Sequence, residues 1–396
     1  MKHYPLLSKP LLSFSFSAFA IGLSEFVVIG LLTQIAASFK LSIPTAGLLI
    51  TAYALGISGG SPILAHVTRK ISSKIICICL ISAFTLANLA SAIVPSFFAF
   101  LAARFFAGAM HGAYFSIAST AAPAIVAPNK APLAIAVMFS GLTVAMVLGV
   151  PAGIEFGVIA GWQSVFIVIS LLSGTAGLLI HFFAPLLNDA IDSANEAPLV
   201  AHLNSRLLTL YSITVLGFGG GFIFFSYIEP YLRDALSFGP SEIAQSLAVI
   251  GLGSLFGNGL GGKLLEILGS MRALICAIVM QSIALSGLAL TLHMPLAFHI
   301  ILFVWSTACF AIAPMVQSSV VTLAAEKKGL NPRLTAAFNA TAFNIGISVA
   351  TFVASRIVTI KGVLDLPFAA ALGVLASLPI LLLDYRRRFS SNASAQ

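Results

Sequence analysis

The stretch LLSFSFSAFAIGLSEFVVIGLLTQ, residues 11–34, is long enough and apolar enough to cross a membrane as one helix. The hydrocarbon core of a bilayer takes about 20 helical residues. The only formal charge in the stretch is Glu25. An unpaired charge at such depth costs at least about 3 kcal/mol, so we expect this carboxylate to have a partner or to line a water-filled path.

Apolar runs of similar length recur along the rest of the chain. Hydrophobic residues make up 59% of the sequence, charged residues only 8%, and mean hydropathy is +1.06. A soluble core cannot bury that much apolar surface, whereas a bilayer can. We therefore predict an all-α membrane protein with twelve transmembrane helices, at about residues 11–34, 45–66, 75–94, 96–121, 132–156, 162–184, 206–230, 242–262, 273–292, 296–322, 334–356 and 366–385.

The basic residues indicate an orientation for these spans. With the N-terminus in the cytoplasm, fifteen of the 20 lysines and arginines fall on the inner side. Because short cytoplasmic loops carry the excess of basic residues, both termini are expected inside. The net charge of +8 is then a topology signal, and we expect no nucleic-acid partner.

The spans divide into two related sets. The longest gap, residues 186–205, holds three acids and predicts a cytoplasmic linker between six-helix bundles at residues 1–185 and 206–396. Gly56 and Gly60 have apparent counterparts in Gly253 and Gly257, each 197 residues further along. Repeated halves that meet at a site near the bilayer midplane are typical of secondary transporters.

Small residues recur at every fourth position in the fifth span, namely Gly141, Ala145, Gly149, Gly153 and Gly157. Such a helix face lets another backbone approach closely. We expect this face, and a similar ridge at Gly253 and Gly257, to lie where the two halves meet and to serve gating, with spans 5 and 8 in contact and spans 2 and 11 likewise. Ordinary packing within one half is the alternative. Pro151 removes a backbone hydrogen bond and is expected to bend the fifth span.

Glu25 and Arg104 are the two formal charges deepest in the predicted spans. At 1.5 Å per helical residue, they lie roughly 21 Å and 18 Å from the cytoplasmic edge. Burial favours a neutral carboxyl group and a nearby guanidinium favours the ionised one. A carboxyl group balanced between these effects suits a proton carrier. The alternatives are a permanent salt bridge that fixes two helices, or direct contact with substrate.

Other polar and aromatic residues in the spans are candidate ligands for protons or substrate. His111 lies two helical turns beyond Arg104 and could relay protons or bind a hydroxyl group, and Tyr114 follows it. Amides and aromatic faces suit a neutral polyol or a flat drug. The substrate-site candidates are Glu25, Arg104, His111, Tyr114, Phe225, Tyr227, Gln317, Asn339 and Asn344. Each of these side chains could instead make an interhelical hydrogen bond or fill the core.

Several segments resemble one known family. SGLTVAMVLGVPAG (residues 140–153) is similar to the fifth-helix antiporter motif of the twelve-span drug:proton antiporters in the major facilitator superfamily, and RFFAGAMHGAYF (residues 104–115) to their fourth-helix motif. SEFVVIGLL, FFSYIEPYL and AFNATAFNIG resemble first-, seventh- and eleventh-helix segments of the sugar efflux and arabinose efflux branch. The resemblance runs nearly end to end and implies a major facilitator fold in which helices one and four face a central cavity.

One motif departs from the family pattern. In ILAHVTRKISSK (residues 63–74), Leu64 and Thr68 stand where the family has Gly and Asp, although Arg69 is retained as a gating candidate. The resemblance therefore does not imply an Asp-centred charge relay in this loop.

We expect a proton-coupled secondary transporter that exports a small sugar, sugar-like compound or drug by alternating access. A proton-coupled uptake symporter of the same fold is the alternative. The sequence holds no HExxH, GxSxG or nucleotide-binding loop, so an enzyme is not expected. No cofactor or metal is expected, because a proton gradient supplies the energy. The expected partners are a small solute, protons and the lipid bilayer, and the expected location is a bacterial inner membrane, as a multi-pass protein that functions as a monomer.

Overall fold

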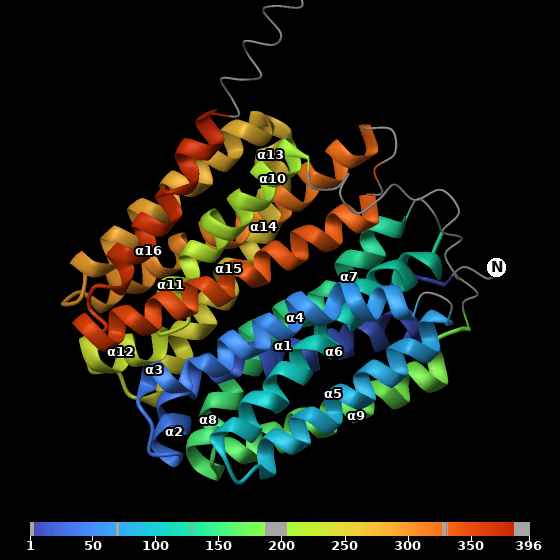
Figure 1. The fold of residues 1–396 in the computed structure, drawn as a ribbon, viewed down its shortest axis with the longest axis horizontal. Helices are drawn as coiled ribbons and strands as arrows, with labels where there is room; N and C mark the ends of the chain where they lie inside the picture. Colours follow the sequence, from blue (N-terminus) through green and yellow to red (C-terminus); the bar gives the residue numbers. More distant parts are fainter. Residues whose placement is uncertain are drawn as a thin grey trace, which may run out of the picture. The chain divides into compact units, whose positions relative to one another are not determined.

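The computed structural model describes residues 4–68, 71–127, 130–186, 204–326, 330 and 332–383, and the regular structure there is helical (Figure 1). Ten helices in this part of the chain are long and apolar enough to cross a membrane. One of them, α13 (Pro240–Leu290), has 51 residues and bends at Gly269, where φ is 73° and ψ is 160°, so it provides two crossings. With α6 (Phe97–Ala124) as a further helix of spanning length, the described residues accommodate the twelve predicted spans. The predicted fold class is confirmed.

Contacts divide the chain into two compact units. Unit 1 comprises Met1–Asp192 and Phe238–Ala248, and unit 2 comprises Ser193–Ser237 and Val249–Gln396. The predicted bundles at 1–185 and 206–396 stay a prediction, and most of the predicted linker lies outside the described residues.

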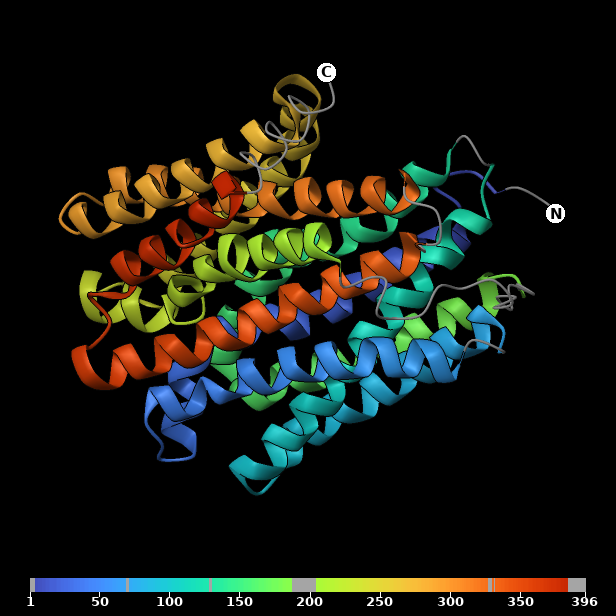
Figure 2. The same ribbon diagram turned by 45° about the horizontal axis from the view of Figure 1, so that its top comes forward.

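Unit 1 holds the first six spans. In addition to α6, its helices are α1 (Lys9–Gly30), α2 (Leu32–Ser38), α3 (Ile43–Ala46), α4 (Leu48–Val67), α5 (Ser73–Ile93), α7 (Ala131–Val144), α8 (Val150–Ala160) and α9 (Trp162–Phe183). α1 packs against α7 and α9, α4 packs against α6, and α5 packs against both α6 and α9. Figures 1 and 2 show α5 and α9 side by side. At the start of α6, the Ser96 hydroxyl accepts a hydrogen bond from the backbone N–H of Ala99 at 3.3 Å, which caps the helix.

The fifth span changes its winding where the sequence predicts a bend. A π-helical turn, η2 (Ala145–Gly149), separates α7 from α8, and Pro151 is the second residue of α8. Proline lacks the N–H that an α-helix would use at this point, and a wider turn accommodates the missing bond. The kink therefore has a local cause in the sequence.

Unit 2 holds the later spans. Its helices, besides most of α13, are α10 (Ser205–Ile213), η4 (Thr214–Phe218), η5 (Gly219–Gly221), α11 (Phe222–Phe225), α12 (Ile228–Leu236), α14 (Pro295–Glu326), α15 (Pro332–Lys361) and α16 (Leu366–Leu375). The seventh span passes from α through π and 3-10 winding between α10 and α11. α15 packs along this irregular span, and Figure 1 shows α11 beside it.

The small-residue face of the fifth span packs within unit 1, which corrects the expectation that it lies between the halves. A Cβ at Gly141 would collide with the carbonyl oxygen of Ser15 on α1. The first-span neighbours of the other three glycines are Phe19 for Gly149 and Val27 for Gly153, both on α1, and Leu31, which directly follows α1, for Gly157; Val165 of α9 also lies near the last two glycines. The spacing correctly indicates a close helix contact, but the partner is the first span.

The ridge on α13 has the same kind of neighbour inside unit 2. Gly253 and Gly257 lie against Ser306 and Thr307 of α14. Gly56 of α4 faces the carbonyl oxygen of Phe105 and the N–H of Ala109, and Gly257 faces the corresponding atoms of Thr307 and Ala311. By contacts, Gly56 therefore corresponds to Gly257, one helical turn away from the match with Gly253 that sequence spacing suggests.

Candidate functional site

Arg104 is the centre of a polar cluster in unit 1. It lies on α6 and is 0% exposed. Its guanidinium carbon sits 3.9 Å from the centroid of the Tyr53 ring on α4, a distance at which the ring face attracts the cation. Phe166 of α9 supplies a second ring at 6.0 Å. The positive charge is thus held mainly by aromatic faces.

A chain of hydrogen bonds connects Arg104 to two further spans. Its Nη1 donates to the hydroxyl of Ser24 on α1 at 3.0 Å. Ser24 in turn donates to Oδ1 of Asn88 on α5 at 2.6 Å, and Nδ2 of Asn88 donates to the backbone oxygen of Phe84 at 2.8 Å. Both Ser24 and Asn88 are fully buried. Spans 1, 3 and 4 are therefore joined at the level of Glu25, as the depth argument predicts for spans 1 and 4.

Glu25 is half-buried and lies next to Ser24 on α1. None of the three ion pairs among the described residues includes Glu25 or Arg104. A permanent Glu25–Arg104 salt bridge, one of the alternatives above, is therefore not present in this structure. Nε of Arg104 has no hydrogen-bond partner in the described part of the chain. The guanidinium thus keeps a spare donor, and it binds Ser24, the residue that precedes the partly exposed Glu25.

His111 belongs to the same cluster, whereas Tyr114 does not. The Tyr53 hydroxyl lies 3.1 Å from Nδ1 of the buried His111. The His111 ring also contacts Phe115, with ring centroids 5.0 Å apart. Tyr114 is fully buried and packs edge-on against Phe115, outside this hydrogen-bonded chain. Tyr53 thus connects the cation and the imidazole.

The aromatic candidates in unit 2 form a packed core. Phe225 is buried, and its ring lies 6.1 Å from Trp305 and 6.4 Å from Phe310 of α14. Trp305 also packs against Phe224, with its Nε1 unpartnered among the described residues. Tyr227 is completely buried as well. In this structure the alternative of core packing describes both candidates.

Two of the three amide candidates bind each other. The Thr214 hydroxyl donates to Oδ1 of Asn339 at 2.7 Å, and Nδ2 of Asn339 donates to Oε1 of Gln317 at 2.7 Å. These bonds connect the seventh, tenth and eleventh spans. Asn344 is different, since Nδ2 donates within its own helix to Ala340 and Oδ1 has no partner in the described part. Among the three amide candidates, Asn344 is therefore the one with a buried acceptor that lacks a hydrogen bond.

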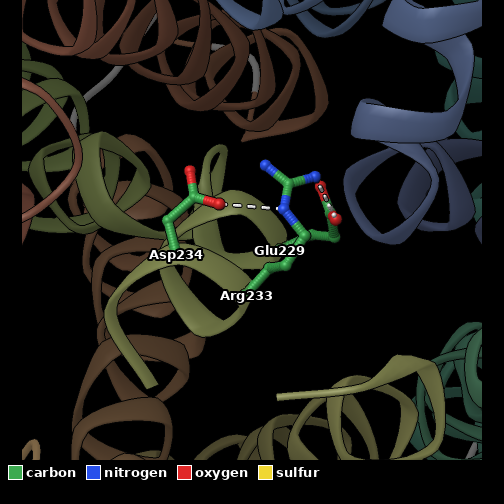
Figure 3. A network of polar contacts seen from close by, with 3 residues as sticks. All are labelled: Glu229, Arg233 and Asp234. Atoms are coloured by element: carbon green, nitrogen blue, oxygen red, sulfur yellow. Dashed lines mark hydrogen bonds and ion pairs between the residues drawn. The ribbon is translucent and has the colours of Figure 1, made fainter. Parts of the chain in front are cut away.

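A second arginine cluster lies on the short helix α12. Arg233 donates Nη1 to Glu229 at 3.4 Å and Nε to Asp234 at 2.9 Å (Figure 3). All three residues are close in sequence, so the pairing holds this helix end together. It belongs to one helix, whereas the Arg104 cluster joins several.

Two further predictions concern the gating candidate Arg69 and metal binding. Arg69 lies outside the described residues. No group of three or more His, Cys, Asp or Glu side chains that could hold a metal ion occurs in the part of the chain that the structure describes. Tyr53, Ser24 and Asn88 were not predicted, because uncharged residues of these types are unremarkable in a membrane span. Only their spacing from Glu25 and Arg104 could have pointed to them.

Known proteins match the chain along most of its length. The family model described as Major Facilitator Superfamily matches residues 14–351. The inner membrane transport protein YdhP of Escherichia coli is 31% identical over 379 residues, 95% of each chain. A probable sugar efflux transporter of Helicobacter pylori is 28% identical over 364 residues, 92% of each chain. A crystal structure of a bacterial homologue of the human lysosomal transporter Spinster has a TM-score of 0.75 at 16% identity, over 96% of this chain and 97% of that one, which shows a common fold.

Proposed function

Because the chain belongs to the Major Facilitator Superfamily, and is thus a membrane transporter and not an enzyme, we propose that it couples inward proton movement to export of a small sugar-like solute. The sugar efflux branch of the drug:proton antiporters is the proposed subfamily, and the name of the Helicobacter pylori relative supports it. A bacterial inner membrane is the proposed location, in keeping with the name of YdhP. The basic residues support an orientation with both termini in the cytoplasm.

The observation that carries the proposal is the half-buried carboxyl group of Glu25 beside a buried arginine with an unused donor. Where water reaches Glu25, the carboxyl group exchanges its proton with that side of the membrane. Ionised Glu25 is attracted to Arg104, and protonated Glu25 is released from it, so the two forms favour different helix arrangements. Proton binding favours one arrangement and solute binding favours the other, so protons and solute cross the membrane in opposite directions.

Polar side chains of each unit, taken by itself, are proposed as substrate contacts. Glu25 and His111 would offer hydrogen-bonding groups from unit 1, and Asn344 would offer its free acceptor from unit 2. Hydroxyl groups of a neutral polyol both donate and accept, so they suit this mixture. Asn339 and Gln317 are proposed to position the eleventh span, since their amides already bind each other.

Transport into liposomes with an imposed pH gradient tests the proposal. The purified chain is reconstituted, and uptake of radiolabelled arabinose, a thiogalactoside and a nucleoside is followed with the lumen made acidic or alkaline. An antiporter loads solute when the lumen is acidic, because protons leave as solute enters. Loading only when the outside is acidic would instead show the uptake symporter.

Two carboxyl variants separate coupling from general damage. Glu25→Gln is expected to abolish gradient-driven loading. Glu155→Gln, which alters another half-buried carboxyl group of unit 1, is expected to load like the unmodified chain. Unchanged gradient-driven loading by the Glu25→Gln protein would refute the coupling role of Glu25.

A further inference from the structure

Unit 1 carries an apolar groove that the proposed transport does not use. It has a volume of about 550 Å³ and lies between α1, α7 and α9. Its walls include Leu12, Phe16, Phe19, Val144, Leu179 and Phe183, and Lys9 lies at one end. Lys9 is the one charged residue in the lining.

The bend in the fifth span explains why the groove exists. Beyond η2, α8 packs against α9, whereas α7, before it, packs against α1 and α6. α7 and α9 both lie on α1 and flank an uncovered face of that helix. Val144, the last residue of α7, is 45% exposed at this face.

The length of the groove matches one leaflet of a bilayer. From Lys9 to Phe19 the helix rises about 15 Å, at 1.5 Å per residue. This is half of the roughly 30 Å hydrocarbon core. A groove of this length, apolar along its walls and open at the side, fits an acyl chain of the surrounding lipid.

Lys9 gives the groove a charge preference. Its Nζ lies 5.2 Å from the centroid of the Phe183 ring, so the ammonium group is held at the mouth. No carboxylate of the described residues pairs with it. An anionic headgroup has a phosphodiester and no positive group, so it complements the ammonium group of Lys9. A zwitterionic headgroup also has a positive group, and the lining offers no acid to pair with it.

We propose that this groove binds one anionic phospholipid, with its phosphate on Lys9 and an acyl chain along α1. In this position the lipid contacts both α1 and α7 where the two helices meet at Gly141, a residue that also lines the groove. The inference does not depend on the proposed direction, substrate or proton coupling of transport.

Native mass spectrometry of the full chain in detergent tests the site, using titrations with phosphatidylglycerol and phosphatidylcholine that carry the same acyl chains. The unmodified chain is expected to bind phosphatidylglycerol about fivefold more tightly, the preference expected from one lysine near an anionic headgroup. Lys9→Gln is expected to remove this preference. Lys263→Gln alters another exposed lysine, on α13, and is expected to keep it.

A second variant tests the acyl-chain part of the groove. Val144→Trp fills the open face with a larger side chain and is expected to weaken binding of both lipids. Equal binding of the two lipids by the unmodified chain, a preference retained by Lys9→Gln, or unchanged lipid binding by Val144→Trp would each overturn the proposal. None of these readouts requires transport, so their failure is distinct from failure of the proposed function.

Discussion

Two arginines of this protein are held in opposite ways. Arg233, with 30% of its side chain exposed, is neutralised by Glu229 and Asp234 on its own helix. Arg104 is completely buried and makes no ion pair with a carboxylate among the described residues; it contacts the Tyr53 and Phe166 rings and the Ser24 hydroxyl. The paired arginine stabilises a helix end. The unpaired one retains attraction for any anion that comes near, which is the property that a coupling site needs.

The same contrast appears between the two units. In unit 1, Gly141 packs on Ser15 and Phe19 of α1. In unit 2, Gly346 packs on Val215 and Gly219, and these two neighbours lie 200 residues after Ser15 and Phe19. This register matches Glu25 with Phe225. In unit 2 that level is occupied by the packed rings of Phe225 and Trp305. The two units thus share a helix frame, and at this level of the frame unit 1 has the Arg104 cluster where unit 2 has packed rings.

Removing each arginine charge should produce the largest difference between the two clusters. Arg104→Gln is expected to lower solute transport about tenfold to hundredfold, since a hydrogen bond to a charged group is worth about 1.5–3 kcal/mol. Arg233→Gln should leave transport within about twofold, because its ion pairs lie within one helix. Initial rates in liposomes measure both. Arg104→Lys serves as the folding control, and equal losses from both Gln variants would erase the distinction.

Tyr53 tests whether a ring face holds the buried cation. Tyr53→Leu is expected to lower the free energy of unfolding by about 2 kcal/mol, the value of a desolvated cation–π contact. Tyr53→Phe keeps the ring and removes only the hydroxyl group, with its contacts to His111 and Ser24, so its loss should be clearly smaller. Denaturant titration in micelles compares the variants. A Phe variant as unstable as the Leu variant would show that the hydroxyl matters and the ring face does not.

The Ser24–Asn88 hydrogen bond should contribute a smaller energy. Ser24→Ala, Asn88→Ala and the double variant form a mutant cycle. The expected coupling energy is about 0.6 kcal/mol, the average for interhelical hydrogen bonds in a membrane protein, and at most about 1.7 kcal/mol. The same unfolding titration provides it. Strictly additive losses would mean that this bond does not connect the spans energetically.

Added salt is expected to produce the smallest of these differences between the Arg233 cluster and the Arg104 cluster. The exposed Arg233 pairs contribute about 0.2–1 kcal/mol, and 1 M salt screens charges beyond about 3 Å. The stability difference between the Arg233→Gln protein and the unmodified chain should therefore shrink in salt. The corresponding difference for Arg104→Gln should persist, since the cation is shielded from solvent ions. Thermal unfolding of the variants at low and high salt measures both differences. Equal salt sensitivity of the two variants would contradict this prediction.

Hydropathy predicted the spans, because it depends only on the residue types in each stretch, and helical rise predicted a common depth for Glu25 and Arg104 from residue counts alone. The partners of Arg104 required the fold. Tyr53, Ser24 and Asn88 come from three different helices, and nothing in one sequence says which helices are neighbours.

The glycine face of the fifth span shows the same limit. Four-residue spacing correctly indicated a close contact, but the nearest neighbours lie within the same unit, chiefly on α1. Likewise, matching Gly56 by sequence missed the contact register by one helical turn, since small residues recur at that interval along the face.

Proton movement driven by solute is the most direct test of a carboxyl group that loads and unloads during transport. Sealed vesicles with a trapped pH dye receive a solute gradient, and exchange of labelled solute is measured in parallel. Glu25→Gln is predicted to retain solute exchange while losing the pH change that the unmodified chain produces. A Glu25→Gln protein that still moves protons with its solute would contradict the account.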